Sequence, residues 1–270
     1  MEHFTELARA RRSIRTFAGG VLRGEDLEKL TAFMAQLKNP YDIPIQCKLL
    51  DGRRQRLKCP AVSGTPLYVG GKVKRVPHME EAFGYSFELL VLYAQSLGIG
   101  TVWIGADMDR ATFEPAMELA EDEITPCMTP LGYSAERMSM RESIIRKGIR
   151  SDSRKPFETL FFDGSFDTPL TPEKAGQLAH PLEMVRWGPS AVNEQPWRIV
   201  VRENAVHLYL RHTKGFVSNA TGDLQKIDMG VALCHFALAA EEAGLEVRFT
   251  ISDPGLPTEA DTEYIASYLL

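Results

Sequence analysis

The chain has 270 residues, a formal net charge of −5 and four cysteines. This length allows one large or two small domains with their own cores, and the negative charge argues against a nucleic-acid-binding protein. The cysteines form no C-x-x-C pair, which argues against a disulfide framework or a zinc site. The polar N-terminus has no signal-like apolar region and no apolar run could span a membrane, so we expect a soluble, cytoplasmic protein.

The first predicted helix, residues 1–10, runs into the segment Arg11-Arg12-Ser13-Ile14-Arg15. Three arginines and a serine so close together can form an anion site, because guanidinium groups donate paired hydrogen bonds to phosphate oxygens. The alternative is a solvated basic patch, since cations also interact favourably with the dipole at the end of a helix. A second, amphipathic helix is predicted over residues 24–37.

A long apolar helix is predicted over residues 79–97, with Phe83 and Phe87 on its buried face and Gly98 as its C-cap. Residues 98–105, which end in Trp103-Ile104-Gly105, are expected to form a buried strand, and this pattern alone indicates only core packing. The other elements expected in this half are strands at 45–50 and 66–71, a helix at 109–120, a strand at 125–133 and a charged helix or insert at 137–149.

Two polar stretches follow. Arg154 and Lys155 form a short basic segment, for which the alternative is a basic surface turn. After a helix predicted over 170–187, residues 189–197 form a stiff polar loop, because two prolines fix φ and prevent a continuous helix. Ser190 and Asn193 supply hydrogen-bonding groups within this loop, although an ordinary helix-to-strand turn would use the same residues.

The rest of the chain again places an apolar helix before a strand. An apolar helix is predicted over 227–243, ending at Gly244, and its His235 is expected to be a core residue because the six histidines form no ligand-spaced cluster. We therefore predict no metal site. The remaining predictions are a hairpin of 199–201 with 206–210 and strands at 245–251 and 264–270.

The loop Pro-Ser-x-x-Asn-x-Gln-Pro-Trp at 189–197 resembles the flavin-binding loop of the FMN-dependent nitroreductase family. The segments Arg-Arg-Ser-x-Arg at 11–15, Trp-Ile-Gly at 103–105 and Arg-Lys at 154–155 are similar to that family's other cofactor contacts. The resemblance implies that the FMN phosphate is held by Arg11, Arg12, Ser13, Arg154 and Lys155. It implies ring or ribityl contacts from Arg15, Trp103, Ile104, Gly105, Pro189, Ser190, Ala191 and Asn193, with Arg15 at the pyrimidine edge.

The two halves of the chain are complementary. Residues 1–163 keep the arginines and Trp-Ile-Gly but lack the loop, whereas residues 164–270 keep the loop and lack the rest. In the ordinary family, each flavin site takes arginines from one subunit and the loop from the other. The resemblance thus implies an α+β nitroreductase-like fold, in which two partial copies with mostly antiparallel sheets and flanking helices form a pseudo-dimer with one composite site.

The function that the resemblance implies is an FMN-dependent oxidoreductase. It would pass electrons from NADH or NADPH to a small acceptor, such as a nitroaromatic or a quinone, with flavin N5 carrying the chemistry and no catalytic side chain. We expect no nucleic-acid or membrane partner, and a monomer can hold the site. The alternatives are a flavin-binding sensor or carrier without turnover, and a structural relic that binds nothing.

Overall fold

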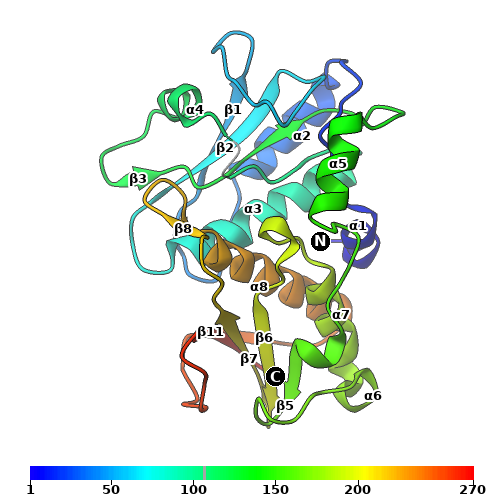
Figure 1. Cartoon of the computed structure of the whole chain (residues 1–270), viewed down its shortest axis with the longest axis vertical. Coiled ribbons are helices and arrows are strands. Elements are labelled where there is room, and N and C mark those ends of the chain that lie inside the picture. Colours follow the sequence, from blue (N-terminus) through cyan, green and yellow to red (C-terminus); the bar gives the residue numbers. More distant parts are fainter. Residues whose placement is uncertain (106–107) are drawn as a thin grey trace.

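The computed structural model describes residues 1–105 and 108–270. Its two long helices, α3 (Met79–Ser96) and α8 (Leu224–Glu242), pack against each other between two sheets (Figure 1). The predicted apolar stripe of α3 is buried, with Phe83, Phe87 and Leu90 fully inaccessible to solvent, because it faces the core of the first sheet. No helix in the described part of the chain combines the length and apolar character needed to cross a bilayer.

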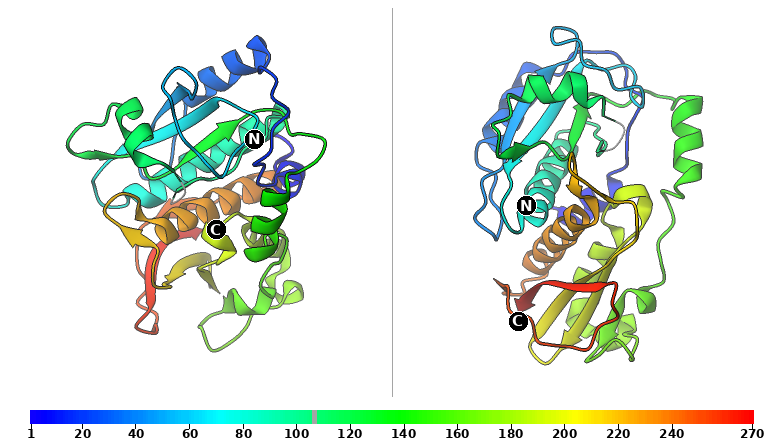
Figure 2. Two further views of the ribbon diagram at one scale, coloured as in Figure 1. Left: turned by 45° about the horizontal axis from the view of Figure 1, so that its top comes forward. Right: turned by 60° about the vertical axis from the view of Figure 1, so that its left-hand side comes forward.

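The first half carries short helices around a small sheet. Its other elements are α1 (Phe4–Ala10), α2 (Gly24–Met34), β1 (Gln46–Asp51), β2 (Leu67–Lys74), α4 (Arg110–Met117), β3 (Glu123–Ile124), β4 (Met128–Leu131) and α5 (Met140–Gly148). Strand β2 pairs antiparallel with β1, β3 and β4. Helix α5 stands out from the body of the molecule (Figure 2), and its Met140 and Ile144 are exposed.

The second sheet has the order β10-β11-β7-β6-β5 and is antiparallel except for the parallel pair β5–β6. Its elements and those around it are η1 (Phe157–Thr159), β5 (Phe161–Asp163), α6 (Pro172–Ala175), η2 (Gly176–Leu178), α7 (Ala179–Trp187), η3 (Ala191–Asn193), β6 (Trp197–Arg202), β7 (Ala205–Arg211), β8 (Val217–Ser218), β9 (Gly222–Asp223), β10 (Arg248–Thr250) and β11 (Thr262–Leu269). The predicted hairpin of β6 with β7 is confirmed.

The chain crosses from the first sheet to the second before residue 163. Phe157 and Phe161 already belong to the hydrophobic core of the second sheet, and β5 pairs with β6. The last residues of the first predicted copy are therefore part of the second layer, which ties the two halves together.

Helices α3 and α8 cross at a glycine from each. A Cβ atom on Gly84 would lie 2.0 Å from the carbonyl oxygen of Ile227, and one on Gly230 would lie 2.1 Å from the carbonyl oxygen of Glu81. Both glycines therefore let the two backbones approach more closely than any side chain would permit.

The spacing of these residues is repeated. Gly84 and Gly230 are 146 residues apart, and so are Gly98 and Gly244, which follow the two helices with φ of 71° and 72°. Glycine closes both helices because the left-handed conformation costs it little. The same offset at the crossing and at both helix ends agrees with two copies of one unit.

Two predicted elements differ from the structure. Residues 98–105 form no regular strand, because Gly100 and Ile104 make single bridges to the segment around β4 while Thr101 bridges to Ser13, so no continuous ladder forms. The helix predicted over 170–187 is broken at Gly176, whose backbone (φ 55°, ψ −124°) cannot continue a helix, so α6 and α7 are separate.

Candidate functional site

The arginine segment lies beside the segment that ends in Trp103-Ile104-Gly105. Ser13 forms a parallel bridge with Thr101, and the backbone N–H of Ile14 donates to the carbonyl of Thr101 at 2.9 Å. Two stretches that are far apart in sequence thus run together, as a shared cofactor site requires.

Arg11 has a buried guanidinium whose Nε and Nη1 find no hydrogen-bond partner in the described part of the chain. Burial lowers its pKa, the Glu88 carboxylate opposes this, and the nearby Arg146 guanidinium lowers the pKa further. A buried donor without a partner costs free energy, so this group suits a bound ligand with anionic oxygens.

Arg154 brings a second guanidinium to the same place. It donates to the carbonyls of Ser153 at 2.7 Å and Trp187 at 3.2 Å, and it lies 5.2 Å from the centre of the Trp187 ring. Its Nε is buried without a partner among the described residues. Burial, followed by the positive charges of Arg11 and Arg186, lowers its pKa to about 10.

We call Arg11, Arg146 and Arg154 the basic cluster. Arg146 is paired with Asp152, whereas Arg11 and Arg154 keep unpartnered nitrogens in the described structure. Like charges that lie together and out of water repel one another, and an anion would relieve that repulsion.

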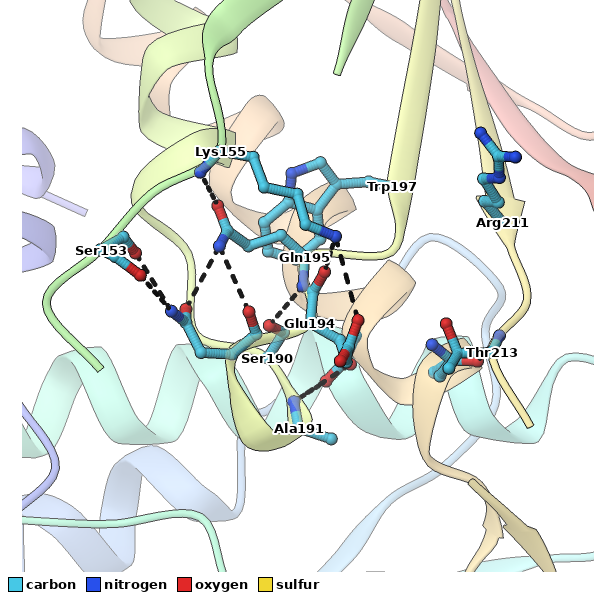
Figure 3. Close-up of polar contacts among 12 residues, drawn as sticks. Ser153, Lys155, Ser190, Ala191, Glu194, Gln195, Trp197, Arg211 and Thr213 are labelled. Atoms are coloured by element: carbon cyan, nitrogen blue, oxygen red, sulfur yellow. Dashed lines mark hydrogen bonds and ion pairs between the residues drawn. The ribbon is translucent and has the colours of Figure 1, made fainter. Parts of the chain in front are cut away.

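The loop at 189–197 is tied to the basic segment by its own side chains. The Asn193 amide donates to the carbonyls of Arg150 at 2.8 Å and Ser153 at 3.1 Å. The Gln195 side-chain oxygen accepts from the backbone N–H of Lys155 at 2.9 Å, and Figure 3 shows Lys155 and Gln195 facing each other. The predicted loop and the predicted basic segment therefore form one structure.

The backbone of this loop is strained. Val192, Asn193 and Gln195 have φ of 44°, 62° and 48°, which non-glycine residues seldom adopt, and a β-branched valine tolerates least of all. Val192 is also 55% exposed. Strain of this kind persists only where surrounding contacts enforce it, and it is concentrated at ligand-binding sites.

Asp228, on α8, is a residue that the sequence analysis missed. Its two carboxylate oxygens lie 3.0 and 3.1 Å from the backbone nitrogen of Ala191, which donates to them, so it anchors the loop to the helix. Burial raises its pKa well above the usual range, despite the hydrogen bond from Ala191, and Asp223 and Glu194 raise it further. An aspartate inside an otherwise apolar helix was the signal that could have found it.

Gly105 reaches the same helix from the first half. A Cβ atom on Gly105 would lie 3.2 Å from both Cys127 Sγ and Leu224 Cδ2, and Leu224 is the first residue of α8. Asp228 follows one turn later and holds Ala191. The end of the Trp-Ile-Gly segment and the start of the loop thus meet at the N-terminal turns of α8.

The remaining predicted residues surround this region. Trp103 donates its indole N–H to Glu88 at 3.0 Å, Ile104 is buried, and Arg12 is exposed at the end of α1. The backbone N–H of Arg15 donates to Glu142 at 3.3 Å, which places α5 against the arginine segment. Pro189, like Ser190, is half-buried where the loop begins.

A cavity of about 420 Å³ lies between the basic segment and the loop at 189–197. Its lining includes Arg154 and Lys155 on one side and Val192, Asn193 and Gln195 on the other. A larger cavity of about 780 Å³ lies among α1, α2 and α3, but none of the predicted cofactor-binding residues lines it. Of the predicted cofactor-binding residues, Arg154, Lys155 and Asn193 line the smaller cavity, and the others lie outside its lining. We place the candidate site at this cavity because it joins the basic segment to the loop.

The corresponding loop of the first half joins α2 to β1. Asp42 has φ of 54° and precedes β1 by four residues, just as Asn193 precedes β6. Here the ring of Tyr41 stacks on His78 with centroids 5.2 Å apart and meets Phe249 edge-on at 4.9 Å. Aromatic side chains thus pack around Tyr41, while Lys38, Asn39 and Pro40 of the same loop line the larger cavity.

Comparison with known proteins identifies the family of this chain. A family model described as "Putative TM nitroreductase" matches residues 3–240. The chain therefore belongs to this nitroreductase family, as predicted from its motifs, and membership supports an oxidoreductase. No curated protein matched the chain.

One solved structure shows the same fold, and two others match about half of this chain. A protein described as a "putative nitroreductase" from Thermotoga maritima is 19% identical, with a TM-score of 0.62 over 99% of this chain and 93% of that one. A nitroreductase family protein from Clostridium novyi is 18% identical (TM-score 0.44, 50% of this chain, 87% of that one). An FMN-dependent nitroreductase from Clostridium difficile is 15% identical (TM-score 0.43, 52% and 94%). The predicted nitroreductase-like fold is confirmed by the first of these.

Proposed function

We propose that the protein is an FMN-dependent oxidoreductase that passes electrons from NADH or NADPH to a small acceptor, such as a nitroaromatic or a quinone. The observation that carries this proposal is the pair of buried guanidinium groups with unpartnered nitrogens, Arg11 and Arg154, beside a strained loop from the other half. Family membership supports the same class of activity.

The residues present fit FMN. The orphaned nitrogens of Arg11 and Arg154 would donate to the phosphate, with Arg12, Ser13 and Lys155 around them. When bound, FMN supplies the hydride-transfer chemistry at its ring. The backbone at Gly105 and the loop at 189–193 would orient the ring, while the Arg15 charge would favour the reduced anion.

The proposed division of the chain into copies at 1–163 and 164–270 explains why one complete site is expected. Arginines come from the first copy and the loop comes from the second, so the site needs no partner subunit. The second candidate function, a flavin-binding sensor or carrier, is favoured by the direct bonds that already occupy Asn193. Oxidation of NADH or NADPH with a quinone or nitroarene acceptor distinguishes turnover from binding alone.

We expect one FMN per chain, retained by the monomer. Tyr41, His78 and Phe249 pack beside the loop of the first half, whereas the loop at 189–197 faces the basic segment across a cavity. Flavin released by denaturation should be quantified against protein, and sedimentation of the loaded protein should show flavin travelling with monomers. Two flavins per chain, loss of all flavin on dilution to monomers, or binding of FAD but not FMN would contradict this proposal.

Replacing Arg11 with methionine should weaken FMN binding by 10- to 100-fold. A hydrogen bond to a charged group contributes about 1.5–3 kcal/mol, and the phosphate would lose its buried donor. Titration with riboflavin, which lacks the phosphate, should show no such loss. The matched control is Arg9→Met, which removes an exposed charge from α1, the helix that ends just before Arg11. Equal losses for FMN and riboflavin would mean that Arg11 does not contact the phosphate.

A further inference from the structure

A buried ion pair or hydrogen bond joins the two long helices. Glu88 on α3 and His235 on α8 are both fully inaccessible to solvent, and Glu88 Oε1 lies 2.9 Å from His235 Nε2. The prediction that His235 is a core residue holds for its position. Its ring nitrogens, however, are both engaged in polar contacts, which simple core packing does not require.

The neighbours of this pair fix where its protons lie. His235 Nδ1 is 2.9 Å from the carbonyl oxygen of Met184, which can only accept, so Nδ1 carries a hydrogen. Glu88 Oε2 accepts from the Trp103 indole, which can only donate. Glu88 Oε1 and His235 Nε2 must therefore share one proton. Without it, a carboxylate would face an imidazole lone pair in a dry interior, and the two would repel each other. Every polar atom of the pair is then satisfied.

The pair connects three parts of the proposed cofactor site. Trp103 begins the Trp-Ile-Gly segment, and its indole is held in place by Glu88 and by the Phe87 ring at 4.9 Å. His235 holds the Met184 carbonyl in α7, and its Nδ1 lies 3.7 Å from the position of a Cβ on Gly188, where the loop starts. The negative charge of the Glu88 carboxylate also raises the pKa of the Arg11 guanidinium, against the effect of burial.

We infer that Glu88 and His235 are positioning residues for the composite cofactor site, holding Trp103 from the first half and the loop of the second half in register. This inference rests on the proposed function for its link to FMN. Stability alone does not account for the pair, since apolar residues of similar volume replace buried ion pairs at little cost and often with a gain in stability. An apolar pair, however, could not accept the hydrogen bond of the Trp103 indole or donate one to the Met184 carbonyl of α7, so it would not fix the position of either group.

The test uses two variants of the full-length protein. In Glu88→Gln, the amide oxygen can still accept from Trp103 while the amide nitrogen donates to neutral His235, so every hydrogen bond is kept. The double variant Glu88→Leu/His235→Leu removes both polar groups together, so neither is left buried without the other, and it should fold. Ser86→Ala is the matched control, because it deletes another buried polar contact of α3, to Asn39, away from Trp103.

Two readouts separate this inference from the proposed function. The indole N–H signals of the three tryptophans are recorded by ¹⁵N NMR without flavin, and FMN affinity is measured by titration. In the double variant the Trp103 indole N–H lacks the hydrogen bond to Glu88 that protects it from exchange with water. We therefore expect this variant to lose the Trp103 signal and to bind FMN at least tenfold more weakly. Glu88→Gln and Ser86→Ala should keep the signal and bind FMN within threefold of the natural chain.

Three outcomes would overturn the inference. One is a folded double variant with an unchanged Trp103 signal and unchanged FMN affinity. Another is a Glu88→Gln variant as impaired as the double variant, because charge and not positioning would then matter. The third is a loss of the same size in Ser86→Ala. If the natural chain binds no FMN, the proposed function fails, and the indole signal still tests whether the pair positions Trp103.

Discussion

Replacing Gly84 with alanine is expected to lower the free energy of unfolding by about 3 kcal/mol or more, a large share of the stability of an ordinary domain. The added methyl group would lie 2.0 Å from the carbonyl oxygen of Ile227, and backbone at a helix crossing cannot move aside as a flexible side chain can. The helices would have to separate, which loosens both cores. Unfolding in urea followed by circular dichroism measures the change, and Gly230→Ala should behave alike.

Gly148→Ala is the control for this prediction. Gly148 closes α5, and a Cβ atom there would meet no heavy atom within 4 Å. Alanine is favoured over glycine in helices by about 1 kcal/mol, so this variant should be unchanged or slightly more stable. A loss below about 1 kcal/mol for Gly84→Ala would show that α3 and α8 do not approach so closely in solution.

Replacing Glu81 with glutamine is expected to make the protein more stable above neutral pH. The Glu81 side chain is buried, its Oε2 has no hydrogen-bond partner among the described residues, and burial raises its pKa from 4.5 to about 7. Between these two pH values the folded state binds the proton more tightly than the unfolded state, so stability falls as the pH rises. Each pKa unit corresponds to 1.36 kcal/mol, which makes the loss about 3 kcal/mol by pH 8.

The measurement is the free energy of unfolding at pH 4.5 and pH 8 for the natural chain and Glu81→Gln. We expect the variant to gain about 2–3 kcal/mol on the natural chain between the two pH values, because an amide has no proton to lose. Glu136→Gln, which replaces an exposed carboxylate, should change the difference by less than about 0.5 kcal/mol. A difference that does not depend on pH would mean that Glu81 is ionised when folded.

The sequence was most informative where a pattern is local. The apolar stripe of α3, the glycine ends of both long helices and the β6–β7 hairpin are set by residues close together in the chain, and each was predicted. The loop and the basic segment were also predicted, but their direct contact through Asn193 was not. That contact depends on how two distant segments pack, which local periodicity does not encode.

The missed features have the same cause. Residues 98–105 form isolated bridges to two segments from elsewhere in the chain, which a short apolar run cannot reveal. Strand β5 joins the second sheet, although it precedes the predicted boundary of the copies. Asp228 gains its importance from Ala191, which lies 37 positions away in the chain.

The aromatic packing around Tyr41 illustrates what the proposed fusion of two copies in one chain would allow. In a symmetric homodimer every substitution occurs twice, so an aromatic side chain that closes one pocket closes its twin as well. In a fused chain the two loops are encoded separately. One loop can therefore pack against aromatic side chains, as around Tyr41, while the loop at 189–197 keeps its strained backbone. Because the halves are tethered, their effective concentration is set by the linker and not by expression level. Two halves that have become different therefore still pair with each other, and not each with a copy of itself.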